Sequence, residues 1–192
     1  MRNLIATVCL GLVTSATALA QAPPPPEKMT VAQIMDRQLS TLEHELVPLV
    51  EAMPENKFTF APTKGEFKGV RTFALQAKHV AHTNFTIFAL LLSEKLPANV
   101  DPKEDDGPPR MTSKAEIVTY LKDSFAMGHR AMAGLTEAAL TERMANPDGD
   151  GPGPTRLGAA SLTVWHSYDH YGQMVEYLRM NGIVPPASRP QR

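Results

Sequence analysis

The residues best suited to chemistry in this sequence are two histidines, His166 and His170, which stand four positions apart. In an α-helix, residues with this spacing lie on one face with β-carbons about 6 Å apart, so both imidazoles can reach one metal ion. Gln173 and Tyr177 continue the same line. A row of polar side chains is costly to bury without a partner. The spacing therefore indicates a pocket for a metal ion or a substrate.

A third ligand is expected from another helix, because two helical histidines seldom hold a metal ion alone. The remaining histidines of the chain are His44, His79, His82 and His129. His79 and His82 are three apart and could line one face, and His79 lies at an edge of the apolar stripe of its segment, where it can point inward. His44 stands between two glutamates and His129 precedes an arginine, so both are expected at the surface.

The N-terminal segment has the features of a signal peptide. Arg2 precedes an apolar stretch at residues 4–12, and Ala18-Leu19-Ala20 fits a cleavage site. Residues 1–20 are therefore predicted to be removed, which would leave a periplasmic or secreted protein without a stable membrane anchor. Cleavage would also remove Cys9, the single cysteine. Any metal ligands of the mature chain would then be nitrogen and oxygen atoms.

Composition narrows the class of partner. The chain of 192 residues has 19 basic and 20 acidic residues, so it lacks the positive charge that binding to nucleic acid requires. Residues 21–29 include four consecutive prolines and are predicted to form an extended tether. The rest suits one domain, at residues 30–188.

Four long segments with helical periodicity would position the histidines. Capping boxes are predicted at Thr30 with Gln33 and at Ser113 with Glu116, each at the start of a segment. Apolar residues then recur every three or four positions. The predicted helices cover residues 30–53, 70–92, 112–133 and 156–180, with a shorter helical piece at 136–144. Trp165 is expected in the core, and no segment has the alternation of a strand. The prediction is an all-α four-helix bundle.

Two stretches of sequence resemble the DinB-like family of metal-dependent proteins. They are Lys78-His79-Val80-Ala81 and the run from His166 through Gln173 to Pro186. The resemblance extends over residues 30–188 and implies a bundle in up-down-down-up order. It also implies a divalent metal ion, zinc or nickel, bound by three histidines, with water at the open position. By position these are His79, His166 and His170. Many relatives have an acidic residue where this chain has His82, whose role stays open.

The resemblance implies an enzyme of hydrolase or thiol-transferase type that acts on a small-molecule substrate, which the sequence does not identify. Export fits poorly with a cytosolic thiol cofactor, which leaves hydrolysis or another, unidentified reaction. Gln173 could serve catalysis by bonding a metal-bound water or the substrate, or it could support a helix contact. The alternative function is a non-catalytic metal-binding or helical interaction module. A homodimer through bundle faces is a further expectation from the resemblance.

Overall fold

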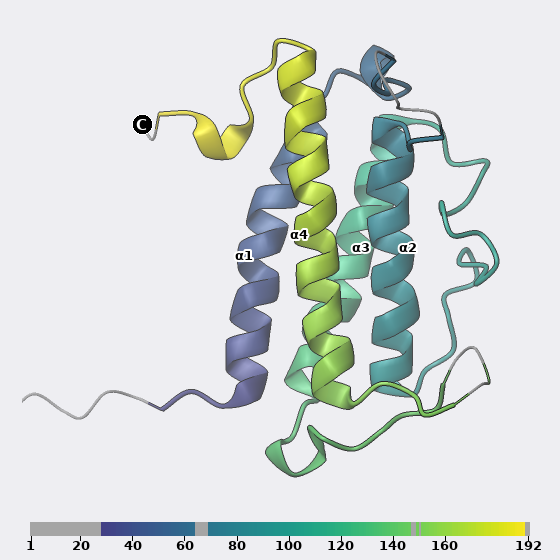
Figure 1. Cartoon of the computed structure of the whole chain (residues 1–192), viewed down its shortest axis with the longest axis vertical. Helices are drawn as coiled ribbons and strands as arrows, with labels where there is room; N and C mark the ends of the chain where they lie inside the picture. Colours follow the sequence, from purple (N-terminus) through teal and green to yellow (C-terminus); the bar gives the residue numbers. More distant parts are fainter. Residues whose placement is uncertain (1–27, 64–68, 147–148, 150, 191–192) are drawn as a thin grey trace, which may run out of the picture.

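The structure, a computed structural model, describes residues 28–63, 69–146, 149 and 151–190. The long helices of this part are α1 (Val31–Ala52), α2 (Phe73–Leu92), α3 (Lys114–Ala133) and α4 (Arg156–Met180). They form a four-helix bundle (Figure 1). Within the described ranges, β pairing is confined to one isolated bridge, so the predicted fold class is confirmed. The predicted signal peptide and residues 21–27 of the predicted tether lie outside the described residues.

The helices run up, down, down and up (Figure 1). The start of α3 meets the end of α1, where Lys114 Nζ donates hydrogen bonds to the backbone oxygens of Glu51 and Met53 at 2.6 and 2.9 Å. The ends of α2 and α3 meet through Glu94 and Arg130, so these two helices are parallel. Both α1 and α2 pack against α3 and α4. The site histidines therefore come from adjacent, antiparallel helices, α2 and α4.

The helix starts follow the capping residues. Both predicted capping boxes are formed, at Thr30 for α1 and at Ser113 for α3. The helix α2 begins at Phe73, three residues later than expected, because the Thr72 hydroxyl accepts a hydrogen bond from the backbone N–H of Leu75 and so caps the helix there. Helix α4 begins after Thr155, which caps Gly158. The three-residue shift leaves His79 in the second turn of α2, close to its start.

The short helical piece predicted at 136–144 is present only over three residues, as the 3₁₀ helix η2 (Glu137–Ala139). The chain beyond it is extended, because its backbone pairs with the segment that enters α4: Met144 N–H donates to Pro154 O at 2.9 Å, and Arg156 N–H donates to Glu142 O at 3.1 Å. This backbone pairing fixes the direction in which α4 starts.

The apolar core is continuous between the four helices, but the middle of the α2–α4 contact is polar. Its buried polar residues are Gln76, His79, His82 and Asn84 on α2, and Thr163, Ser167 and His170 on α4. Below the histidines, Asn84 accepts a hydrogen bond from Ser167 Oγ at 3.4 Å and donates one to Ser124 Oγ at 3.3 Å. The Asn84 amide and the Ser124 and Ser167 hydroxyls are thereby hydrogen-bonded, as most buried polar groups are.

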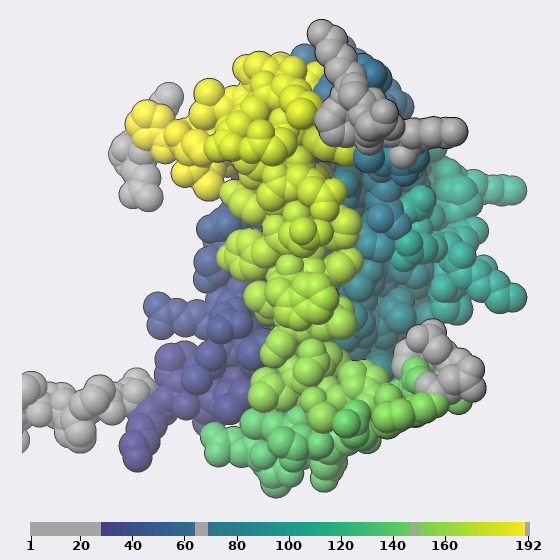
Figure 2. Space-filling model, in the orientation of Figure 1, coloured from purple at the N-terminus to yellow at the C-terminus, as the bar shows by residue number. Residues whose placement is uncertain are grey.

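The expectation that Trp165 lies in the core is wrong, since 60% of its surface is exposed. It stands two residues after the buried Thr163, which places it about 200° around the helix from the buried face. Figure 2 shows α4 lying exposed along its length on one face of the molecule. Among the described residues, no helix combines the length and apolar character needed to cross a membrane.

Candidate metal centre

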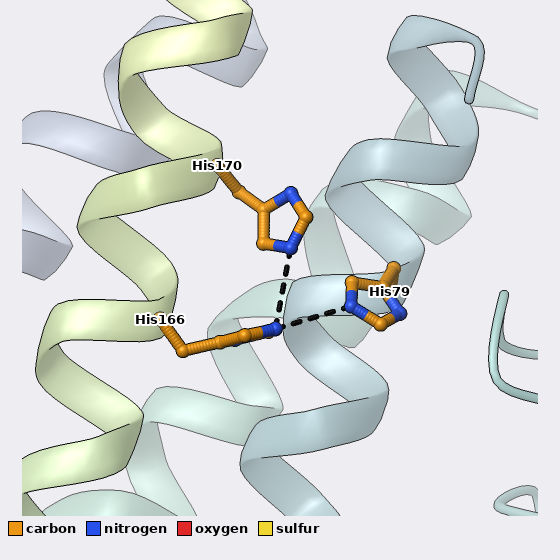
Figure 3. A group of neighbouring side chains, drawn as sticks. All are labelled: His79, His166 and His170. Atoms are coloured by element: carbon orange, nitrogen blue, oxygen red, sulfur yellow. Dashed lines mark hydrogen bonds between the residues drawn. The ribbon is translucent and has the colours of Figure 1, made fainter. Parts of the chain in front are cut away.

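Three histidines meet between α2 and α4 (Figure 3). Nε2 of His166 lies 3.1 Å from Nε2 of His79 and 3.2 Å from Nε2 of His170. His79 and His170 are buried and His166 is half-buried. One ligand atom from each residue lies within 4.8 Å of the other two. The structure thus brings the three predicted ligands to one point, which we call the three-histidine cluster.

The outer nitrogen of His79, Nδ1, points away from the cluster, and its hydrogen bond determines whether the inner nitrogen, Nε2, carries a hydrogen. His79 Nδ1 lies 2.8 Å from the backbone oxygen of Asp105. A carbonyl oxygen only accepts, so Nδ1 carries the hydrogen and donates it, and Nε2 of the neutral ring presents a lone pair to the cluster. Arg71 holds the loop in place through ion pairs to Asp105 at 2.6 Å and Asp106 at 2.5 Å.

The outer nitrogen of His170 belongs to a chain of hydrogen bonds. The Asp169 carboxylate accepts from Gln173 Nε2 at 2.8 Å, so Gln173 presents its oxygen to Gln76 Nε2, also at 2.8 Å. Gln76 then presents its own oxygen to His170 Nδ1 at 2.5 Å. The chain has one direction, because an ionised carboxylate can only accept. His170 Nδ1 therefore donates, and its Nε2 also presents a lone pair to the cluster.

The neutral cluster consequently has fewer N–H donors than lone pairs that need one. The lone pairs of His79 and His170 both point to Nε2 of His166, and a neutral His166 can supply at most one hydrogen there. Its Nδ1 is buried and has no hydrogen-bond partner within the described part of the chain. A bound cation would satisfy all three Nε2 atoms at once.

The distances suit a metal ion of ordinary size. Nitrogen ligands about 2.1 Å from a tetrahedral metal ion lie about 3.4 Å from each other. The Nε2 atoms of the cluster, at 3.1 and 3.2 Å, are within a few tenths of an ångström of this value. Rings whose other nitrogen donates to a carbonyl or amide oxygen are typical of metal-binding histidines. The donor set therefore fits a divalent ion that prefers imidazole nitrogen.

The surroundings keep the histidines neutral. Burial lowers the pKa of His166 to about 4, helped by the neighbouring His79. Burial also lowers the pKa of His170 to about 4, with His166 and His79 adding to the effect. Both rings are therefore neutral at pH 7, and the neutral imidazole is the form that binds metal ions.

The remaining histidines lie apart from the cluster. His82 is buried, its Nδ1 has no partner among the described groups, and burial lowers its pKa. His129 was expected at the surface, but it is half-buried between two carboxylates of α1, with Nδ1 2.6 Å from Asp36 and Nε2 3.0 Å from Glu43. His44 is exposed, as expected.

Gln76 is the functional residue that the sequence analysis missed. It stands three residues before His79, a spacing that places both side chains on one helix face, and this is the signal that could have found it. Gln173 is exposed, and its amide contacts Gln76 and Asp169. The structure thus places Gln173 two hydrogen bonds away from the His170 ring, and its contact with substrate or a metal-bound water stays a prediction.

Comparison with known proteins assigns the family. A search of curated protein sequences finds no match to this chain. The family model of the DinB superfamily matches residues 38–174, a range that includes His79, His166 and His170. The match covers well over half of the 192 residues, and the helical bundle and the buried histidine group are in accord with it. The chain belongs to the DinB superfamily.

Proposed function

We propose that this protein is an exported, divalent-metal-dependent enzyme in which His79, His166 and His170 hold zinc or nickel. The observation that supports it most is the convergence of the three Nε2 atoms, two of them with lone pairs whose direction is fixed by hydrogen bonds on the far side of the ring. Three protein ligands leave a position open on a four-coordinate ion, which is the arrangement of catalytic sites.

When bound, such an ion supplies the Lewis acidity that activates water or a thiol. The protein's own contribution is to hold the ligands in place. The Asp105 carbonyl fixes the ring of His79, and Gln76 fixes the ring of His170. Gln173 and Asp169 in turn fix the amide orientation of Gln76. Of the two reaction types in the proposal, hydrolysis is favoured over thiol transfer, because an exported protein meets water but not a cytosolic thiol.

A non-catalytic metal-binding module is the second candidate. Two of the three ligands are buried. The carbonyl of Asp105 orients the ring of His79, and the carboxylate of Asp169 orients the amide of Gln173. An arrangement of this kind also suits a site that only binds metal. Catalysis requires the open position to be accessible to a substrate, so the two candidates differ in the activity of the metal-loaded protein.

The first experiment is metal content by mass spectrometry of mature protein purified without chelator. The expected result is about one zinc or nickel ion per chain, as in open three-ligand sites, and loss of this metal in His166→Ala. His44→Ala is the matched control, because His44 is exposed and outside the cluster. Equal metal in wild type and His166→Ala would contradict the proposed site. A screen of the metal-loaded protein against esters, amides and thiol conjugates then separates enzyme from binding module.

Export and assembly are further parts of the proposal. Residues 1–20 support export by their resemblance to a signal peptide, and N-terminal sequencing of protein from a periplasmic extract would test it, with Gln21 as the expected first residue. The homodimer is supported by the family resemblance alone. Light scattering of the purified mature chain tests it, with twice the chain mass as the expected result.

A further inference from the structure

A small cavity continues the α2–α4 contact beyond the three-histidine cluster. Its volume is about 250 Å³, and its walls are Thr86, Ile87 and Leu90 of α2, Ala159 and Leu162 of α4, and Asn146 and Pro154 of the adjoining loop. The lining is mostly apolar, with Thr86 and Asn146 as its polar members. These wall residues carry no charge. The Thr86 hydroxyl donates to the backbone oxygen of His82 at 3.0 Å, so its hydrogen-bonding need is met within the helix. We call this space the apolar cavity.

The apolar cavity lies on the same helix faces as the ligands. On α4, Leu162 stands four residues before His166, and on α2, Thr86 and Leu90 stand seven and eleven residues after His79. These spacings keep residues on one face of an α-helix. Because α2 and α4 are antiparallel, both stripes extend from the cluster toward the same end of the bundle (Figures 1 and 3). Cavity and cluster thus follow one another along a single seam.

The two parts are close, and the seam between them reaches the surface. Leu162 is one helical turn from His166, a rise of about 6 Å. The half-buried side chains along the seam are those of Thr83, Thr86, Leu162 and His166. The residues that follow Thr83 and Leu162 in the sequence, Asn84 and Thr163, are fully buried. The half-buried side chains therefore outline a path along the surface from the cluster to the cavity.

We propose that the apolar cavity binds the alkyl or aryl part of the substrate, whose polar reacting group lies at the three-histidine cluster. This inference rests on the proposed function and adds to it a substrate class: small molecules with a polar head and an uncharged apolar tail. A cavity of about 150 Å³ is large enough to bind benzene, so about 250 Å³ suits a phenyl ring or an alkyl chain of comparable bulk. An uncharged lining disfavours a charged tail, which would lose part of its hydration without gaining a partner.

A series of hydroxamic acids tests the proposal, because their common head group binds metal ions while the tail is varied. The probes are acetohydroxamate, butanohydroxamate, hexanohydroxamate and benzohydroxamate, added to zinc-loaded protein. Trp165 is the single tryptophan, and its ring centroid lies 6.5 Å from that of His166, so its fluorescence reports binding. The expected result is an affinity that rises about fourfold for each buried methylene, the equivalent of about 0.8 kcal/mol.

A pair of variants assigns the tail to the cavity. In Leu162→Ser, the gain in affinity from acetohydroxamate to hexanohydroxamate is expected to be at least about fourfold smaller than in wild type, the factor of one methylene group. Acetohydroxamate itself is expected to bind as in wild type. Val184→Ser is the matched control, since Val184 is 57% exposed outside the bundle helices, and it is expected to keep the full dependence. Equal affinity for all tails in the wild type, or a tail dependence that Leu162→Ser leaves intact, would overturn the proposal.

A measurement without metal separates this proposal from the proposed function. In the metal-free protein, 1-hexanol is expected to shift the methyl NMR signals of Ile87, Leu90 and Leu162 but not that of Val184. Methyl shifts together with an absence of metal binding would support the cavity and reject the metal-dependent function. Metal binding without any methyl shift would overturn the cavity and leave the metal-dependent function standing.

Discussion

The α2–α4 contact and the α1–α3 contact each contain a histidine site, and the two differ in what surrounds the rings. Between α2 and α4, three imidazoles face one another. The Nδ1 atom of His170 donates to the amide oxygen of Gln76, and that of His79 donates to the backbone oxygen of Asp105, whose carboxylate lies 3.2 Å away. Between α1 and α3, a single imidazole, that of His129, contacts the carboxylates of Asp36 and Glu43.

The two surroundings have opposite effects on protonation. Burial and the neighbouring imidazoles lower the pKa of His166 and of His170 to about 4. Burial also acts to lower the pKa of His129, but hydrogen bonds to Asp36 and Glu43 outweigh it and raise the pKa. The first environment therefore favours the neutral ring, which can donate a lone pair to a metal ion, and the second favours the cation, which cannot. Spacing alone does not separate these cases, since the burial of each ring and the charges in direct contact with it decide between them.

The largest expected effect of this difference is on stabilisation by metal. Zinc at about a thousand times its dissociation constant adds about 4 kcal/mol to the free energy of unfolding, which raises the Tm of a domain of this size by about 10 °C. We expect this rise in wild type and in His129→Ala, and its loss in His79→Ala. Differential scanning calorimetry of chelator-treated protein, with and without added zinc, measures it. An equal rise of the Tm in His79→Ala would show that zinc stabilises the protein without the three-histidine cluster, and would contradict the distinction between the two sites.

The second prediction concerns Gln76, which orients the ring of His170. Gln76→Leu removes the acceptor for His170 Nδ1–H and is expected to weaken zinc binding about 10- to 100-fold, as loss of such outer partners does. Gln76→Glu retains an acceptor oxygen and is expected to bind zinc more tightly than Gln76→Leu. Competition with a chromogenic chelator measures the affinity. Gln38→Leu, at an exposed position of α1, is the control, and equal affinities for Gln38→Leu and Gln76→Leu would contradict the orienting role.

These residues also show how far the sequence could predict the site. The spacing of His166 and His170 lies within one helix, and capping residues such as Thr30 act within one turn, so local sequence determines both. The family motif added His79. The link between His170 and Gln76 crosses from α4 to α2, and such a contact depends on helix packing that no local pattern specifies.

Burial was the property that the sequence predicted least well. His129 was assigned to the surface because an arginine follows it, but its partners Asp36 and Glu43 come from another helix and are seven residues apart on one face of α1. Trp165 was assigned to the core because it is apolar, although its position on α4 turns it away from the other three helices. In both cases the residue type or a sequence neighbour suggested one environment, but the helix face on which the residue lies places it in the other.

The third prediction is that acidification changes the stability contributions of the two sites in opposite directions. His129 has a raised pKa in the folded state, so its contribution, about 1 kcal/mol for a pair that is partly exposed, is fully present below the ordinary pKa of about 6.5. It is lost as the pH rises through the folded pKa. Urea unfolding of wild type and His129→Asn is expected to show a difference that is largest below pH 6.5 and disappears at high pH.

The metal-free three-histidine cluster should behave in the reverse way. The folded pKa of His166 and of His170 is about 4, below the ordinary value, so the unfolded chain binds more protons between pH 6.5 and 4. Stability is therefore expected to fall as the pH decreases through this range. In His166→Asn the fall should be smaller than in wild type. A fall of the same size in both proteins would show that another group is responsible.

The smallest expected effect separates the two carboxylates that contact His129. Asp36 lies closer to the ring than Glu43, at 2.6 Å against 3.0 Å, and a shorter charge-assisted hydrogen bond is the stronger one. Asp36→Asn is therefore expected to lower the pKa of His129 more than Glu43→Gln does, and each is expected to change the free energy of unfolding by less than about 1 kcal/mol. An NMR titration of the His129 ring protons measures the pKa. Neither variant should alter zinc affinity, because both act at the α1–α3 contact, and a change in zinc affinity would mean that the two histidine sites are coupled through the bundle.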